Sequence, residues 1–199
     1  MKKYLLLNCI MSLAIFTFAF TIFSSEVKAQ GRPTTGTAKT ANKTNPIPKD
    51  WFYVYEKKKG YGFYVPKGTT GGLETIGKVD LTVLKTPQGL DIFVLAYKDK
   101  TLTKADLLQD AVGFLEELGQ TITPKEFVGE SDEYAVADAD TVHPTLGKGK
   151  LRILVGTDVT DNYIMIIGAS VKDFTANEAT IDGIWGSFEM WSGGASGNN

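Results

Sequence analysis

The chain has 199 residues, 43% of them hydrophobic, and a formal net charge of −2. Basic and acidic residues are mixed along it, so the sequence shows no electrostatic footprint for nucleic acid or for an anionic membrane. The single cysteine, Cys9, lies near the amino terminus. A chain processed after residue 29 therefore has no cysteine, which excludes disulfides, thiol catalysis and cysteine-ligated metals.

The first 29 residues have the features of a signal peptide. Two lysines precede an apolar run at residues 5–23, and Val27 and Ala29 place small residues at the positions that a signal peptidase requires. Cleavage removes three lysines and one glutamate, which leaves 18 basic and 22 acidic residues. We expect export to the periplasm or the medium. If the segment stays uncleaved, it is long enough to serve as a membrane anchor.

The rest of the chain divides into a leader, one domain and a tail. Residues 30–50 are rich in Thr, Lys, Asn, Gly and Pro, and they lack the apolar area that would offset the entropy of ordering them. We expect a disordered leader there, a single domain at 51–191, and a flexible tail at 192–199.

The first half of the domain is predicted to be strands followed by a helix. Aromatic and β-branched runs at 51–55 and 61–65 flank Lys57-Lys58-Lys59-Gly60 and predict a hairpin. Strand character then covers 73–86, and the run at 90–97 is apolar on nearly both faces, as in an interior strand. A helix is predicted at 102–118.

Capping signals define that helix. Thr103 and Asp106 stand in N-cap and N3 places, and Gly119 is a natural residue just beyond the end. Gly113 interrupts the helix, and a close approach to the sheet would explain it.

The second half is predicted to be strands closed by a helix. One bent or broken strand is expected at 125–140, and a hairpin pairs 150–158 with 162–172. A closing helix follows within 174–191, because Thr175 and Glu178 have capping-box spacing and an apolar stripe comes after them. The order of elements predicts an α+β domain, with a mainly antiparallel sheet and both helices packed on it.

Four segments resemble the PsbP-like superfamily, which includes PsbP and DcrB-type exported proteins. They are Gly60-Tyr-Gly-Phe-Tyr-Val-Pro66, the helix at 102–118, the strand at 163–171, and Ile184-Trp-Gly-Ser-Phe188. The resemblance covers about residues 51–191. It implies an α/β/α sandwich around an antiparallel sheet, export, and binding or assembly roles more often than catalysis.

The aromatic residues are the first candidates for a binding surface, since interfaces are enriched in Tyr and Trp. Plain core packing is the alternative explanation for them. The candidates lie in the early hairpin and at the end of the domain: Trp51, Tyr53, Tyr55, Tyr61, Tyr64 and Trp191.

A metal site is a second possibility. Asp138 and Asp140 share a face of a strand, whereas His143, the only histidine, falls on the other face unless the chain turns near Val142. Such a site would have hard or mixed oxygen and nitrogen ligands. An extracytoplasmic hydrolase using the same region is the enzymatic alternative.

No catalytic motif is assembled in the sequence. No serine stands in Gly-x-Ser-x-Gly, and the glycine-rich turns lack the Gly-Lys-Ser/Thr of a phosphate loop. We therefore expect a non-catalytic exported domain that contacts a protein partner or a small apolar ligand, with no cofactor and no nucleic acid.

Overall fold

A computed structural model of the chain describes residues 38–40, 47–98, 102–158 and 161–191. The predicted signal peptide, the predicted tail and most of the predicted leader lie outside these residues. Within the described part, no helix combines the length and the apolar character needed to cross a bilayer.

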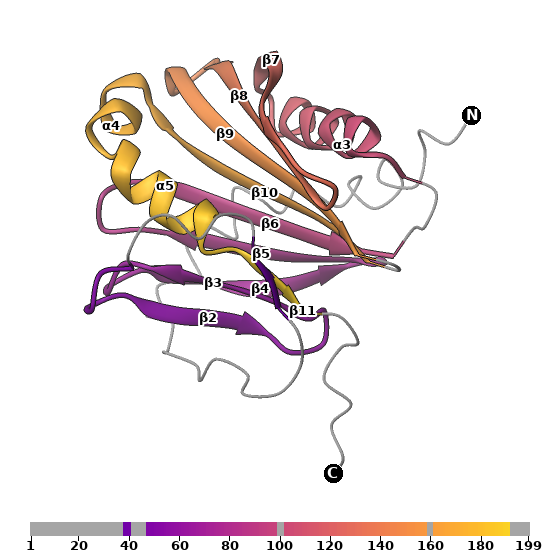
Figure 1. Cartoon of the computed structure of the whole chain (residues 1–199). Coiled ribbons are helices and arrows are strands. Elements are labelled where there is room, and N and C mark those ends of the chain that lie inside the picture. The colour runs from indigo at the N-terminus through magenta and orange to yellow at the C-terminus, as the bar shows by residue number, and fades with distance from the viewer. Residues whose placement is uncertain (1–37, 41–46, 99–101, 159–160, 192–199) are drawn as a thin grey trace.

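Two antiparallel sheets face each other (Figure 1). The large sheet has seven strands in the order β4-β5-β6-β10-β9-β8-β7. Its strands are β4 (Thr70–Ile76), β5 (Val79–Lys85), β6 (Asp91–Tyr97), β7 (Thr121–Glu130), β8 (Tyr134–His143), β9 (Gly147–Asp158) and β10 (Asp161–Ser170). The small sheet has four strands in the order β1-β11-β3-β2. They are β1 (Ala38–Thr40), β2 (Phe52–Glu56), β3 (Tyr61–Val65) and β11 (Glu189–Trp191).

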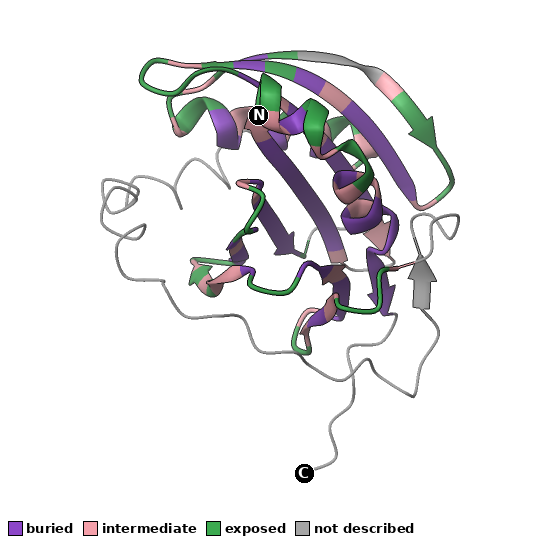
Figure 2. Cartoon of the chain, turned by 90° about the vertical axis from the view of Figure 1, so that its left-hand side faces the viewer, coloured by how far each residue is buried: buried purple, intermediate pink, exposed green. Residues whose placement is uncertain are grey.

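The helices cover opposite faces of the large sheet. α3 (Lys104–Glu117) lies on one face and packs Leu107, Phe114 and Leu115 into a core with the strands beneath it. α4 (Val171–Ala176) and α5 (Glu178–Gly186) lie on the other face, together with the small sheet. In Figure 2 the buried positions run along the interior strands, and the exposed ones lie on turns, on outer helix faces and on the edge strand β7. The α+β prediction, with helices on a mainly antiparallel sheet, is confirmed.

The second core joins the two sheets. Its aromatic centre is Phe188, whose ring centroid lies 5.8 Å from that of Tyr61, 6.0 Å from Tyr163 and 6.4 Å from Tyr134. β10 contributes to both cores, because Tyr163 and Met165 face this core while Ile164 and Ile166 face α3. The continuous apolar run in β10 therefore marks a strand buried on both faces, as the sequence predicts.

The first predicted helix is confirmed, together with the residues predicted to cap its two ends. Thr103 and Asp106 form a reciprocal capping box, and Gly119 takes the left-handed conformation with φ 80°. The close approach proposed for Gly113 is wrong, since no atom lies within 4 Å of the place where its Cβ would stand.

Two predicted strands are each a hairpin. Residues 73–86 contain the end of β4 and β5, joined by Gly77 and Lys78, with Ile76 opposite Val79. Gly77 has φ 62°, which a two-residue hairpin turn requires. Residues 125–140 likewise fall in β7 and β8, which pair with register shifts between Pro124, Phe127 and Gly129.

The predicted closing helix is three elements. Ser170, rather than Thr175, caps the first of them by accepting a hydrogen bond from the N–H of Asp173. Asn177 begins α5 without a side-chain cap, so the predicted capping box is wrong. The chain leaves α5 at Ser187 and becomes β11, which includes Trp191. The leader also contributes a strand, because β1 pairs with β11.

Candidate functional site

The small sheet presents an aromatic surface on the side away from the core. Strand alternation turns Val54, Tyr61, Phe63 and Met190 inward. The opposite positions carry Tyr53, Tyr55, Tyr64, Glu189 and Trp191, which we call the aromatic face. None of the three described helices lies on this side of the small sheet (Figure 1).

Tyr53 is the centre of the aromatic face. It lies opposite Tyr64 in the strand pairing and crosses diagonally over Gly62. A Cβ at Gly62 would stand 2.3 Å from the Tyr53 hydroxyl oxygen, so only glycine leaves room for this ring. The Tyr53 hydroxyl donates to Glu189 Oε2 at 2.9 Å and accepts from Trp191 Nε1 at 3.1 Å. The two hydrogen bonds therefore fix the orientation of the Tyr53 and Trp191 rings.

Two further rings surround Tyr53. The Tyr64 ring meets it edge-on, with centroids 5.0 Å apart, and the Tyr55 ring stacks beside it at 6.3 Å. Tyr53 and Trp191 are buried, at 4% and 7% exposure, whereas Tyr55 and Tyr64 are half-buried. Burial raises the pKa of the Tyr55 phenol, and the neighbouring Glu56 carboxylate adds to the effect. The accessible part of the face therefore includes the rings of Tyr55 and Tyr64, and both effects favour the neutral form of the Tyr55 phenol.

The end of α5 holds the aromatic face in place. The Ser187 hydroxyl donates to the Ile184 carbonyl at 2.8 Å and accepts from the Tyr64 N–H at 2.9 Å. The Trp191 N–H donates to the Gly60 carbonyl at 2.6 Å. Ser187 therefore connects β3 to the end of α5, and the backbone hydrogen bond from Trp191 to Gly60 connects β11 to the start of β3. These bonds fix the strands that carry the rings.

The other two predicted aromatic residues lie elsewhere. Tyr61 is fully buried between the sheets, where its hydroxyl shares a hydrogen bond of 2.6 Å with Thr82 Oγ1. Trp51 packs against Gly183 of α5, where a Cβ would approach its ring to 2.9 Å. The structure therefore brings together four of the six predicted residues and adds Glu189, which the sequence analysis missed.

The three predicted metal ligands do not come together. Asp138 and Asp140 lie on the α5 side of β8, and His143 lies at the strand end on the other face. His143 Nδ1 accepts hydrogen bonds from the backbone N–H groups of Thr145 and Leu146, at 3.1 and 3.2 Å. No group of three or more His, Cys, Asp or Glu side chains in the described part of the chain is placed to hold a metal.

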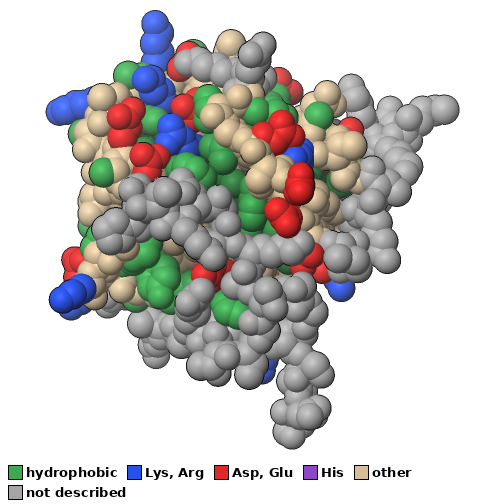
Figure 3. All heavy atoms as spheres, in the orientation of Figure 1, with side chains coloured by type: hydrophobic (Ala, Val, Ile, Leu, Met, Phe, Trp, Pro, Cys, Tyr) green, Lys and Arg blue, Asp and Glu red, His purple; other side chains and the backbone are tan. Residues whose placement is uncertain are grey.

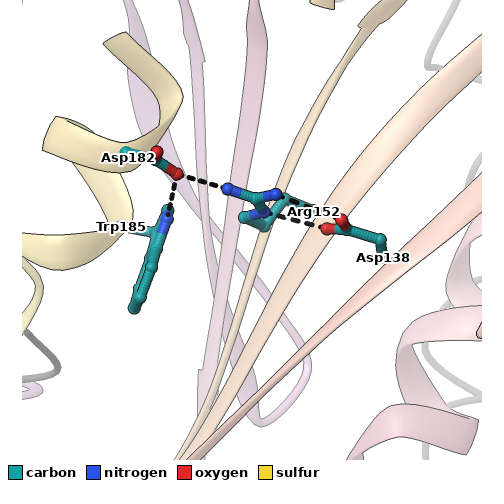
Figure 4. A network of polar contacts seen from close by, with 4 residues as sticks. All are labelled: Asp138, Arg152, Asp182 and Trp185. Atoms are coloured by element: carbon teal, nitrogen blue, oxygen red, sulfur yellow. Dashed lines mark hydrogen bonds and ion pairs between the residues drawn. The ribbon is translucent and has the colours of Figure 1, made fainter. Parts of the chain in front are cut away.

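Asp138 instead belongs to a polar network that joins the large sheet to α5 (Figure 4). Its carboxylate accepts two hydrogen bonds from Arg152 of β9, at 2.8 and 3.1 Å. Arg152 also pairs with Asp182 of α5, which in turn accepts from Trp185 Nε1 at 3.0 Å. The hydrogen bonding of Arg152 to the Asp138 carboxylate is the main reason that the pKa of Arg152 is raised.

The charged side chains of this network are paired with one another. The Arg152 guanidinium lies 6.0 Å from the centroid of the Phe174 ring, so this one side chain contacts both α4 and α5. Acidic and basic side chains are intermingled across the face in Figure 3, and the described residues form no large area of a single sign there. The surface around this network is therefore a solvated one, with ion pairs between its side chains.

Comparison with known proteins identifies the class of fold. Cyanobacterial PsbP (CyanoP) from Synechocystis sp. PCC 6803 matches with a TM-score of 0.54 and 15% identity, over 76% of this chain and 99% of that chain. The resemblance to the PsbP-like superfamily is thereby confirmed at the level of the fold. Another match is LpqN, involved in cell envelope biogenesis of Mycobacterium tuberculosis, with 14% identity over 88% of this chain and 96% of that one. Its TM-score is 0.38, too low to support an argument. No family model and no curated protein matches the sequence.

Proposed function

We propose that this chain is a non-catalytic exported domain that binds a partner protein through the aromatic face. The observation that carries the proposal is the position of four aromatic side chains on the side of the small sheet that faces away from its core. Interfaces concentrate Tyr and Trp in this way, because these rings offer large contact areas at low cost in conformational entropy.

The arrangement of the face supports a preorganised contact. Tyr53, Glu189 and Trp191 fix one another by hydrogen bonds, so binding requires little further ordering. Tyr55 and Tyr64 remain half-exposed next to this fixed centre. They are the two rings that a partner would contact, and each carries a phenolic hydroxyl at its edge.

Export rests on the amino-terminal sequence. The positive start, the apolar run at 5–23 and the small residues at Val27 and Ala29 together have the form of a cleavable signal. The absence of cysteine after residue 29 is compatible with either redox environment.

A photo-crosslinking amino acid placed at position 55 tests the proposal in the native host. A partner on the aromatic face gives a covalent adduct from position 55, identified by mass spectrometry, and none from position 128. Val128 is the matched control, since it is 63% exposed on β7, in the large sheet. The adduct at position 55 should disappear when Tyr64 is replaced by Ala.

Two results would count against the proposal. One is an equal yield of adducts from both positions, which indicates non-specific contact. The other is native mass spectrometry that shows a small apolar molecule retained by the wild-type chain and lost in the Tyr55→Ala variant, which assigns the face to a ligand instead.

A further inference from the structure

Within the described part of the chain, four strands lie at the edges of the two sheets, and these edges differ in how well they are protected against pairing with another chain. β1 has three residues and β2 has five, with three lysines directly after β2. β7 is longer, but it contains Pro124 and two shifts of register. Short strands, lysine, proline and irregular pairing are the usual means by which edges avoid new partners.

β4 has none of these protections. All seven of its residues, from Thr70 to Ile76, pair with β5 in one uninterrupted register. It contains no proline and no lysine, and Glu74 is its only charged residue. No described strand lies beyond it in the sheet. None of its residues is buried, and Leu73 is one of the few large apolar side chains that are exposed, at 43%.

The sequence of β4 is compatible with pairing to its own copy. Directly opposed residues in an antiparallel pair share a face, so a two-fold axis between two copies of a strand must pass midway between the two copies of one residue, which then stands opposite itself. Leu73 is the midpoint of β4. Pairing of the whole strand therefore places Leu73 against Leu73 of the second copy, and Gly72 against Glu74.

This register pairs the outward-pointing backbone N–H and C=O groups of β4 and places no like charges opposite each other. The two exposed leucines cover each other on the face of the large sheet that also carries the small sheet. Each glutamate stands opposite a glycine, which leaves space for its side chain and avoids opposing like charges. Gly71 accommodates the close approach of β5, since a Cβ there would stand 2.0 Å from the Val83 carbonyl oxygen.

We propose that the free edge of β4 pairs with β4 of a second copy of this chain, antiparallel about a two-fold axis at Leu73. The two large sheets then form one continuous sheet across the dimer. The aromatic face belongs to the small sheet, so dimer formation and the contact proposed for that face are separate properties.

Single cysteines test the register directly. In a Cys9→Ser background, Leu73→Cys places two cysteines at about 4.5–5.5 Å between Cα atoms, within the range of a disulfide. Mild oxidation should therefore link most of the chains into covalent dimers. Thr75→Cys is the matched control on the same face of the same strand. Its two copies are offset by four residues, or about 14 Å, so they cannot be joined.

The mass in solution tests the dimer itself. At about 100 µM, light scattering should give the mass of two chains for the wild type and for Val128→Asp on β7. Leu73→Asp, which opposes two carboxylates at the axis, should give the mass of one chain with an unchanged circular dichroism spectrum. A wild type that is monomeric at this concentration overturns the proposal. So does a Leu73→Asp variant that remains dimeric, or a Thr75→Cys variant that cross-links as well as Leu73→Cys.

Discussion

Tyr53 shows how a single polar contact organises the aromatic face. Its hydroxyl accepts a hydrogen bond from the indole N–H of Trp191 and donates one to the buried carboxylate of Glu189. A buried hydrogen bond to a charged group stabilises more than a neutral one, and a buried partner left without it costs more still. Tyr53 therefore couples β2 to β11.

Replacing Tyr53 with Phe tests this coupling. The change keeps the ring over Gly62 but removes the hydroxyl that serves Glu189 and Trp191, so the free energy of unfolding should fall by about 1–3 kcal/mol. Urea denaturation followed by tryptophan fluorescence measures the loss. Tyr55→Phe removes a hydroxyl from a half-buried ring on the same strand and should change stability by less than about 0.5 kcal/mol. Equal losses in the two variants would contradict the role given to Tyr53.

The residue types of the aromatic face can be predicted from the sequence, but the direction of every side chain cannot. Tyr53 and Tyr55 alternate with Val54, so their shared face follows from the period of a strand. Tyr61 and Tyr64 differ by three positions and so must point to opposite faces, which the sequence analysis did not use. Glu189 was missed because the segment was assigned to a helix, where its alternation with Phe188 and Met190 has no meaning.

The helix α3 illustrates how local signals determine an element. Its capping box, its apolar face and its terminal glycine all agree, and the structure reproduces each of them. Gly113 is the one disagreement. It has no close neighbour to explain it, so its effect on the helix should be purely conformational.

Gly113→Ala should therefore stabilise the protein. Alanine in the middle of a helix is favoured over glycine by about 0.5–1 kcal/mol, and no atom stands in the way of the new methyl group. Gly119 is the matched control, since a Cβ there also meets nothing within 4 Å, but its φ of 80° strains any other residue. The midpoint temperature of thermal unfolding should rise for Gly113→Ala and fall for Gly119→Ala. A shift in the same direction for both would contradict this explanation.

The elements that were predicted wrongly are those in which a turn divides one apolar segment into two elements. Gly77 and Lys78 form a two-residue turn inside what was predicted as one strand, although glycine between two apolar runs is a recognised hairpin signal. Residues 131–133 divide β7 from β8 with no glycine or proline, so the break is marked only by the weaker turn residues Ser131 and Asp132. At the end of the domain, Gly186 and Ser187 end α5, yet the apolar spacing continues past them and imitates a longer helix.

For the molecule as a whole, the arrangement into two sheets depends on contacts between segments far apart in the chain. The core between the sheets contains Tyr61, Tyr134 and Tyr163, which come from three different hairpins and converge on Phe188. Hydrophobic patterning identifies each as a core residue. The pairing of β11 between β1 and β3, which creates the second sheet, leaves no periodic signal in the sequence.

These three tyrosines predict an alkaline limit to stability. Burial raises the pKa of each phenol above its ordinary value of 10.0, so the folded state retains protons that the unfolded chain releases near pH 10. Their contribution to stability is therefore complete below pH 10 and is lost as the pH rises above it. Of the tyrosinate absorbance at 295 nm, the part that these three residues contribute should increase together with the loss of circular dichroism, in one cooperative step.

The variant Tyr163→Phe provides the control. With one buried phenol fewer, the free energy of unfolding should fall less steeply between pH 10 and 11. Ionisation of the three tyrosines near pH 10 in a chain that keeps its circular dichroism would show that their hydroxyls reach solvent.

The place of β11 has a consequence for how the protein is made. β11 is the last described element in the chain, yet it lies in the interior of the small sheet, between the first strand and the third. A nascent chain that has been synthesised only as far as α5 lacks the strand that joins β1 to β3, and Met190 is missing from the core between the sheets. The large sheet can assemble during translation, but the second sheet is completed only after residue 191 has left the ribosome. A chain that crosses a membrane before that point does so without its finished fold.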